Sequence, residues 1–356
     1  MIALINLGWS EHFASAFEPY REKGLVPGRV VLEHNHLLRV RTAAGEILAE
    51  LAGKLRHEAA GRQELPAVGD WVVLRVEPGG ERASILAVLP RVSACSRKVA
   101  GEETLEQVVA ANIDAIFLVS ALDHDFNPRR IERYVVLARR SGAQPVIILN
   151  KIDKASDVDA AIAETVAVAP DVPILPLCTK DGRGFDLLAP YLRAGKTVAL
   201  LGPSGVGKSS IINRLIGSEL LKTADVRESD SRGRHTSVHR QLVELPSGGL
   251  LIDTPGMREL QLFDMAGAVD ETFPDIDALG LNCRFRDCRH HQEPGCAVKR
   301  AVDEGALDAA RYGSFIKLQE EHEAFAKRQD ERELLDIKRQ SKIGSRAMKS
   351  LQKDRE

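Results

Sequence analysis

A glycine-rich run is the clearest chemical signal in this 356-residue chain. Its sequence, GPSGVGKSS, matches the pattern G-x-x-x-x-G-K-[ST], in which backbone N–H groups surround a phosphate chain at the positive end of a helix. Lys208 is expected to reach the terminal phosphates, and the Ser209 hydroxyl is expected to bind Mg²⁺. The predicted phosphate contacts are Gly202, Pro203, Ser204, Gly205, Val206, Gly207, Lys208, Ser209 and Ser210.

A second run has the residue types that read a guanine base. Asn150, Lys151, Ile152 and Asp153 form an N-K-x-D sequence directly after the apolar run Val146–Leu149. The Asp153 carboxylate can accept from two neighbouring guanine donors, N1–H and the 2-amino group, whereas adenine lacks the amino group and would leave the carboxylate unpaired. Asn150 is expected to steady the loop and the base, and the stem of Lys151 is expected to cover the ring.

The next strand is followed by Cys178, Thr179 and Lys180, at the position where GTPases place a short loop that also contacts the base. Thr179 stands where alanine is usual. These three residues are predicted to be a second base-binding loop.

Two later segments could complete a magnesium site and a γ-phosphate site. In the sequence DTPG, Asp253 is expected to hold Mg²⁺ directly or through water, and the Gly256 N–H is expected to sense the γ-phosphate. Between the phosphate loop and DTPG lies SRGRHTS, where Thr236 is the first choice for a Mg²⁺ ligand and Ser237 the second. The alternative for this segment is a plain basic loop.

The catalytic group predicted from these segments comprises Lys208, Thr236, Gly256 and His235. Ras-like GTPases orient the attacking water with a glutamine just after the D-x-x-G loop, but here that residue is Met257, which cannot orient water by hydrogen bonding. His235 is the best internal substitute. The free protein is therefore predicted to be slow and to be completed by a partner.

The order of these segments is unusual. In ordinary GTPases the phosphate loop comes first and N-K-x-D late, but here Asn150 precedes Gly202. This order is a circular permutation, which is physically allowed because domain termini tend to lie close together at the surface. The segment SRGRHTS corresponds to the first switch of such enzymes and DTPG to the second, so the permutation makes the second switch lead directly into the C-terminal region.

A cluster of cysteines and histidine has the composition of a metal site. Cys283, Cys288, His290 and Cys296 supply three thiolates and an imidazole, which fill the four positions of a structural zinc ion. His291 is an alternative fourth ligand, and reduced surface thiols are the alternative to a metal site. The chain has five cysteines, an odd number with one tight cluster, which argues against a secreted disulfide framework.

Three regions are predicted to position these residues: a barrel with an N-terminal lead-in (1–93), a doubly wound, circularly permuted P-loop GTPase domain (94–262), and a zinc-binding helical domain with a basic tail (263–356). The lead-in, which contains Trp9, is expected to be a helix, and residues 94–110 are expected to be a linker.

Short strands without helical period predict an OB-type barrel. The predicted barrel strands are Arg29–Glu33, Leu37–Arg41, Glu46–Leu51, Trp71–Val76 and Ser84–Leu89. The central domain is expected from buried strands at Ala115–Ala121, Val146–Leu149, Ile174–Leu177 and Thr197–Leu201, helices at Arg129–Ser141 and Ser210–Ile216, and a strand pair at Gln241–Leu245 and Leu250–Ile252.

The barrel carries basic residues that could face nucleic acid or form an ordinary solvated surface. They are Arg29, Arg39, Arg41, Lys54, Arg56 and Arg62. Trp71 is the only aromatic residue in the predicted barrel strands, so phosphate and shape contacts are expected to dominate over base stacking. The basic tail at Lys338–Arg355 is either a further contact with nucleic acid or a solubilising end.

The net charge is -2, no stretch approaches the roughly 20 apolar residues of a membrane span, and the N-terminus lacks a signal-peptide pattern. We expect a cytoplasmic protein without a membrane partner.

The permuted order, together with GPSGVGKSS, GRHTS, DTPG and CRFRDCRHHQEPGCAV, resembles the RsgA/YjeQ family of ribosome-biogenesis GTPases over nearly the whole chain. The resemblance implies an N-terminal OB fold, hydrolysis of GTP to GDP stimulated by the small ribosomal subunit, late maturation of that subunit, and contacts to its ribosomal RNA. It implies a monomer whose nucleotide state controls association and release, with Mg²⁺ at the nucleotide and one structural zinc ion per chain. The departures are GRHTS in place of the more usual GRHTT, and Met257 where many members carry phenylalanine.

Two other classes of function remain open from the residues. One is an ATP-dependent kinase or motor that uses the phosphate loop, against which N-K-x-D and the lack of a second catalytic module count. The other is a non-catalytic RNA-binding scaffold with a structural nucleotide. Competition between GTP and ATP addresses the first, and single-turnover hydrolysis with and without small subunits addresses the second.

Overall fold

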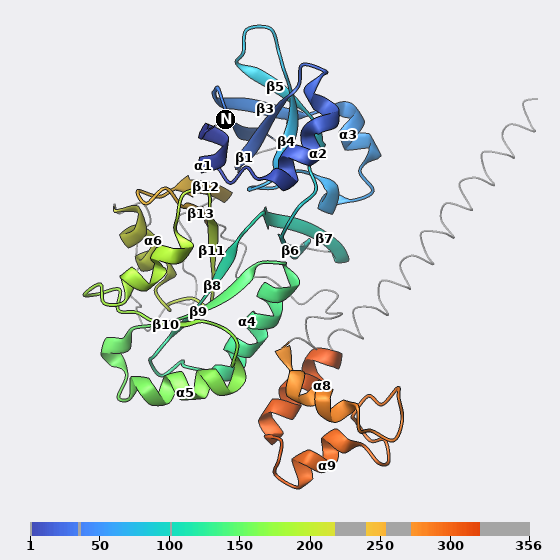
Figure 1. Cartoon of the computed structure of the whole chain (residues 1–356), viewed down its shortest axis with the longest axis vertical. Coiled ribbons are helices and arrows are strands. Elements are labelled where there is room, and N and C mark those ends of the chain that lie inside the picture. The colour runs from blue at the N-terminus through green and yellow to red at the C-terminus, as the bar shows by residue number, and fades with distance from the viewer. Residues whose placement is uncertain (1, 35–36, 100–101, 218–239, 254–271, 321–356) are drawn as a thin grey trace, which may run out of the picture. The chain divides into compact units, whose positions relative to one another are not determined.

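The computed structural model describes the chain except for residues 1, 35–36, 100–101, 218–239, 254–271 and 321–356 (Figure 1). The chain divides into two compact units, one of residues 1–98 with 105–261 and the other of residues 99–104 with 262–356. The predicted boundaries after residues 93 and 262 stay a prediction. The basic tail lies outside the described residues.

The central part of the first unit is a mostly parallel sheet. Its strand order is β10-β9-β8-β11-β13-β12, in which only β12 runs antiparallel to its neighbour. Each predicted strand of this region is present within a few residues of its expected bounds. The observed strands are β8 (Ala115–Ala121), β9 (Gln144–Asn150), β10 (Ile174–Pro176), β11 (Thr197–Leu201), β12 (Arg240–Glu244) and β13 (Leu250–Asp253).

Helices cover both faces of this sheet because its strands are apolar on both sides. Along β8, Ile116 and Leu118 join the core beneath two helices, while Phe117 and Val119 join the core on the opposite face. The first face is covered by α4 (Pro128–Arg140) and α5 (Val158–Val168), and the second by α6 (Lys208–Ile216) and the 3-10 helix η3 (Phe185–Tyr191). The doubly wound α/β architecture predicted from the sequence is confirmed.

The N-terminal part of the first unit is a closed five-stranded barrel. The strands follow the order β1-β2-β3-β5-β4, and β4 also pairs with β1, which closes the barrel. All five predicted barrel strands are present. They are β1 (Val26–His34), β2 (Leu37–Thr42), β3 (Gly45–Leu51), β4 (Trp71–Val76) and β5 (Arg82–Val88), with α3 (Gly53–Glu58) and the 3-10 helix η1 (Arg62–Glu64) between β3 and β4.

Two helices precede the barrel, α1 (Ile2–Asn6) and α2 (Glu11–Arg21). They confirm the expected helical lead-in that packs on the barrel, since the ring of Trp9 lies 4.7 Å from that of Trp71. Trp71 is fully buried, so it offers no surface for stacking a base.

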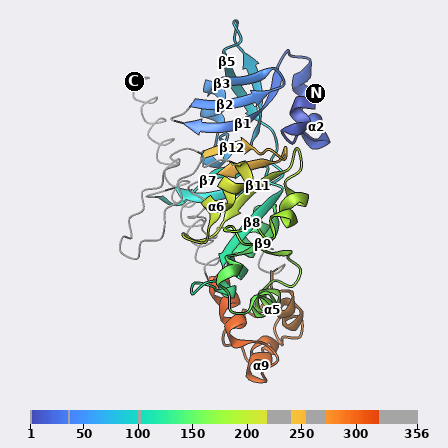
Figure 2. The same cartoon turned by 90° about the vertical axis from the view of Figure 1, so that its left-hand side faces the viewer.

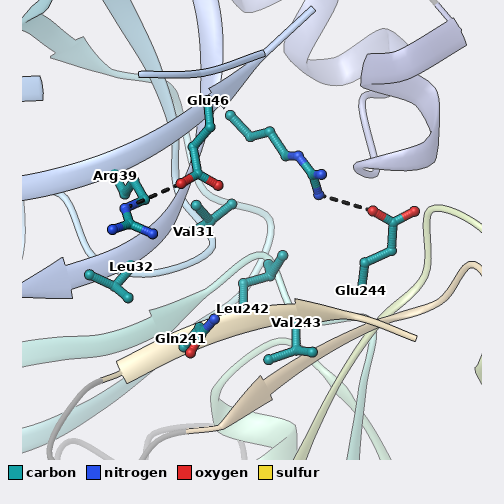
Figure 3. Close-up of a pocket in the computed structure, with 9 residues that line it drawn as sticks. Val31, Leu32, Arg39, Glu46, Gln241, Leu242, Val243 and Glu244 are labelled. Carbon is teal, nitrogen blue, oxygen red and sulfur yellow. Dashed lines mark hydrogen bonds and ion pairs between the residues drawn. The ribbon is translucent and has the colours of Figure 1, made fainter. Parts of the chain in front are cut away.

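The barrel continues directly into the GTPase sheet. β1 pairs antiparallel with β12, with Leu32 opposite Gln241 and Glu33 opposite Arg240, and Figure 2 shows the two strands side by side. Beyond this pairing lies a cavity of about 180 Å³, lined by residues of β1, β2, β3 and β12 (Figure 3). Arg41 on β2 bridges it to Glu244 on β12 at 2.9 Å. Barrel and nucleotide domain therefore share one eleven-stranded sheet.

The segment expected to be a linker is a strand pair instead. β6 (Ala94–Val99) and β7 (Glu102–Ala111) form a two-stranded sheet. Cys95, Val109 and Ala110 are buried in the main core of the first unit. The prediction was wrong because this burial comes from contacts with distant segments, which leave little trace in the local sequence pattern.

The described part of the second unit is small and mainly helical. It contains α8 (Pro274–Gly280), α9 (Ala297–Asp303) and helical residues 309–320. Arg311 ties the last helix to the start of α8, because its guanidinium forms two bonds of 2.6 Å with the Asp275 carboxylate. Within the described parts of the chain, no helix is long and apolar enough to span a bilayer.

Arg29 was expected to lie on the barrel surface, where it could face nucleic acid, but the structure places it in the interior. The side chain is 1% exposed, and its guanidinium donates to the carbonyls of Leu7 at 2.5 Å, Gly69 at 3.1 Å and Asn112 at 2.9 Å. Burial lowers the pKa of Arg29 to about 10, and Asp114 and Asp70 counteract that effect, so the group stays charged at neutral pH. One buried cation thus joins the lead-in, the barrel and the start of the GTPase region.

We predict that Arg29→Met destabilises the first unit by about 3 kcal/mol, because three interior carbonyls lose their donor. The control is Arg39→Met, since Arg39 is half exposed and pairs with Glu46 at 3.2 Å on the surface. That change should cost less than about 1 kcal/mol. Urea unfolding measures both, and equal losses for the two variants would contradict the role assigned to Arg29.

Candidate functional site

The predicted nucleotide loops meet at one edge of the central sheet. β9 ends at Asn150 and β11 at Leu201, and both strands are parallel to β8, which lies between them. Because parallel strands end at the same edge of a sheet, the base-reading loop and the phosphate loop emerge next to each other.

The Asn150 side chain connects three of these loops. It is fully buried, and its amide nitrogen donates to the Val206 carbonyl in the phosphate loop at 2.8 Å. Its amide oxygen accepts from the backbone N–H and the hydroxyl of Thr179, each at 3.3 Å. Asn150 was expected to steady its own loop. In the structure its side chain also binds the phosphate loop and the second base loop.

The phosphate loop needs glycine at two positions for reasons of space and backbone conformation. Gly207 precedes α6 with a φ of +99°, and a Cβ there would lie 2.3 Å from the Asn150 amide nitrogen. Gly202 has a φ of +156°, and its Cβ would lie 2.3 Å from the Val119 carbonyl oxygen. Both glycines let the loop pass close to neighbouring strands, which no larger residue would permit.

Lys208, Ser209 and Ser210 occupy the first turn of α6, at the positive end of its dipole. The Lys208 ammonium donates to the carbonyls of Gly202, at 2.7 Å, and Pro203. The lysine thus lies over the loop that the sequence assigns to phosphates.

The base-reading loop is held by contacts to the loops that follow the two neighbouring strands, β8 and β10. Lys151 has a left-handed backbone, with φ +63°, and its ammonium lies 2.8 Å from the Asp123 carboxylate. The thiol of Cys178 donates to the Asp153 carboxylate at 3.4 Å, which links the two predicted base loops. Burial raises the pKa of Asp123, but the hydrogen bonds from Lys151 and the Asp125 N–H outweigh it and hold that pKa below its usual value.

The second base loop is also contacted from α6. Arg214 donates to the carbonyls of Thr179 at 3.3 Å and Asp181 at 3.4 Å, and lies 5.1 Å from the centre of the Phe185 ring. Lys180 is exposed beside these residues. Neither Arg214 nor Asp123 was predicted from the sequence. The one available signal was that Asp123 lies two residues past a buried strand, in the region where site residues gather in α/β sheets.

Part of the predicted magnesium and catalytic group cannot be placed. Asp253 is the last residue of β13, within reach of the sheet edge on which the other loops lie. Thr236, Ser237, His235, Gly256 and Met257 lie outside the described residues.

The cysteine cluster of the second unit brings its four predicted ligands together. The ligand atoms of Cys283, Cys288, His290 and Cys296 all lie within 4.8 Å of one another. His290 has a left-handed backbone, with φ +62°, and Tyr312 donates to its carbonyl at 2.5 Å. The alternative ligand, His291, is outside this group and lies 3.9 Å from Glu320. The geometry therefore selects His290.

The donor atoms of the cluster suit a soft metal once they are deprotonated. Burial lowers the pKa of His290, which keeps the imidazole neutral, as a ligand must be. Burial opposes the ionisation of Cys283, but N–H groups of Ala297 and Val298 outweigh it and lower its pKa. Burial and the neighbouring thiols raise the pKa of Cys288 to about 12. A bound cation would offset the repulsion among three thiolates, so the donor set fits zinc.

Comparison with known proteins points to a GTPase, in agreement with the arrangement of the nucleotide loops. The sequence model of the RsgA GTPase family matches residues 88–263. The small ribosomal subunit biogenesis GTPase RsgA of Opitutus terrae is 48% identical and covers 92% of each chain, and RsgA 2 of Lactiplantibacillus plantarum is 45% identical, covering 85% of this chain and 84% of that one.

Two solved structures have the same fold. YjeQ from Thermotoga maritima matches with a TM-score of 0.61 at 28% identity, over 83% of this chain and 97% of that one. YloQ, described as a circularly permuted GTPase, matches with a TM-score of 0.60 at 25% identity, over 85% of this chain and 96% of that one. These similarities favour a GTPase over an ATP-dependent kinase, a motor or a non-catalytic scaffold.

Proposed function

The chain belongs to the RsgA family of circularly permuted GTPases, and we propose that it hydrolyses GTP to GDP and phosphate on the small ribosomal subunit during the late maturation of that subunit. The observation that carries the proposal is the convergence of the base-reading and phosphate loops on one sheet edge, tied by the Asn150 amide. Its nucleotide state would control association and release. It would act in the cytoplasm as a monomer in contact with ribosomal RNA.

We assign the guanine contacts to Asn150, Lys151, Ile152 and Asp153, with the second base loop beside them. The support is physical: Asp153 has a carboxylate positioned by Cys178, and guanine supplies the two donors that such a carboxylate needs. The second base loop is Cys178, Thr179 and Lys180, and the phosphates are assigned to the run from Gly202 to Ser210.

We assign the nucleotide's magnesium to Ser209, Thr236 and Asp253. When bound, Mg²⁺ neutralises charge that develops on the phosphates. Lys208 would hold the terminal phosphates, and the Gly256 N–H would donate to the γ-phosphate. His235 is the proposed internal group for orienting the attacking water.

One structural zinc ion per chain is proposed at Cys283, Cys288, His290 and Cys296. Three cysteines and a histidine fill a tetrahedral shell and leave no open position for catalysis, so the ion would stabilise the second unit.

The shared sheet supports a link between nucleotide state and the barrel. β12 begins at Arg240, three residues after the predicted switch residue Ser237, and β13 ends at Asp253 of the second switch. β12 pairs with β1 of the barrel, and Glu244 pairs with Arg41. A change in the conformation of either switch would therefore act on β12 or β13, which lie in the same sheet as the barrel strands.

The base assignment predicts that Asp153→Asn weakens GDP binding by about 2–3 kcal/mol, because an amide cannot accept from both guanine donors as a carboxylate does. The variant should gain affinity for xanthosine diphosphate, whose 2-oxo group accepts from the new amide. Titration with both nucleotides measures this. Parent-like GDP binding would show that Asp153 does not read the base.

The metal assignment predicts about one zinc ion per chain in protein purified without chelators. Chelation should expose residues from about 272 onward to protease and leave GDP binding largely intact, because the zinc stabilises only its own unit. Restoring zinc should reverse the change. An unchanged protease pattern after chelation, or zinc-free protein at purification, would count against the site.

The proposed function predicts slow GTP turnover by the free chain and faster turnover with purified small ribosomal subunits. The reason is that Met257 cannot orient water, so partner binding must favour a productive switch conformation. Turnover is measured at saturating GTP, with large subunits as the control. Rapid turnover by the free chain, or no response to small subunits, would refute the partner's role.

A further inference from the structure

Asp123 lies at a position that no motif assigns. It is two residues past β8, the strand between the one that ends in the base-reading loop and the one that ends in the phosphate loop. The residue therefore emerges at the same sheet edge as both loops. Its side chain is 14% exposed.

The two oxygens of the Asp123 carboxylate have separate partners. One accepts from the Asp125 backbone N–H at 3.1 Å, which fixes the orientation of the carboxylate within its own loop. The other accepts from the Lys151 ammonium at 2.8 Å. Charge-assisted bonds between partly buried groups are stronger than those on an open surface. The neighbouring carboxylate of Asp125 is engaged elsewhere, with Arg130 at 2.7 and 2.9 Å.

Lys151 needs such an anchor for two reasons. Its backbone is left-handed, a conformation that disfavours a residue with a Cβ and persists where surrounding contacts impose it. Its side chain is long and would otherwise sample many rotamers, at an entropic cost when it is ordered. The bond to Asp123 fixes the ammonium, and the Ile152 N–H donates to the Leu177 carbonyl at 3.3 Å on the other side of the loop.

We propose that Asp123 is a positioning residue for guanine nucleotides: by holding the Lys151 ammonium, it orders the lysine stem along the face of the base. This inference rests on the proposed function, which assigns Lys151 to the base. Asp123 itself touches no nucleotide in this scheme. It raises affinity because the stem is ordered before the base arrives, so binding bears less of the ordering cost.

The test is Asp123→Asn in the full-length chain. Asparagine keeps the shape and the oxygen that accepts from the Asp125 N–H, and it removes the charge that holds Lys151. We expect GDP and GTP to bind about 3- to 10-fold more weakly, and to the same extent, because the contact lies at the base. With small subunits present, KM for GTP should rise by that factor while kcat at saturation stays unchanged.

Two further variants separate positioning from a general structural effect. In a Lys151→Met background, Asp123→Asn should weaken binding no further, because the anchored group is gone. The control is Asp171→Asn, which removes the charge of a more exposed carboxylate that pairs with Arg139 at 2.6 Å just before β10, at the opposite end of the strands from the nucleotide loops. Its nucleotide affinity should equal that of the parent.

The outcomes distinguish this inference from the function it rests on. Unchanged or tighter binding by Asp123→Asn, while Asp153→Asn weakens GDP, would overturn the role of Asp123 and leave the guanine site standing. An equal loss from Asp123→Asn in the Lys151→Met background would also overturn it. A parent chain that binds no guanine nucleotide would overturn the proposed function and this inference with it.

Discussion

A single buried amide makes the three nucleotide loops one structure. Asn150 presents a donor to the phosphate loop and an acceptor to the second base loop, and it has no solvent exposure through which water could replace either contact. A buried amide with one side unpaired would be costly, so the three loops stabilise one another's positions. Gly207 is required by the same constraint, because any side chain there would displace the amide.

The circular permutation changes what lies next to this site in the chain. The strands that flank the two predicted switches, β12 and β13, are adjacent in the sheet, and β12 also pairs with β1 of the barrel. Arg29 then fixes the barrel to the lead-in helices and to the beginning of the GTPase region through three backbone carbonyls. The Arg29 guanidinium can be buried here because three interior carbonyls accept its hydrogen bonds. These bonds offset the free-energy cost of removing the charge from water.

The second unit is organised on a different principle. Its described residues bury a small set of apolar side chains, among them Phe273, Ile276 and Phe315, and the ring of His290 in the metal cluster lies 6.0 Å from that of Phe315. Small units with little apolar area commonly depend on a metal for stability. The Arg311–Asp275 pair supplements the cluster by connecting the helical segment at 309–320 to the start of α8.

Structural features that are set by residues close together in the chain could be predicted from the sequence. The doubly wound sheet and the five barrel strands are confirmed, and the four predicted metal ligands lie together, because residue type and short spacing determine turns, strand periodicity and ligand reach. The nucleotide contacts of the phosphate loop and the N-K-x-D run stay predictions. The tertiary structure decided what depends on distant contacts. It formed the strands β6 and β7 in the segment expected to be a linker, and it placed Arg29 in the interior and His290, rather than His291, among the three cysteines. It also brought Asp123 to Lys151 and Arg214 to the second base loop. The partners of Arg29 are 22, 40 and 83 residues away, and such contacts are set by how the sheet is assembled, which a local pattern does not record.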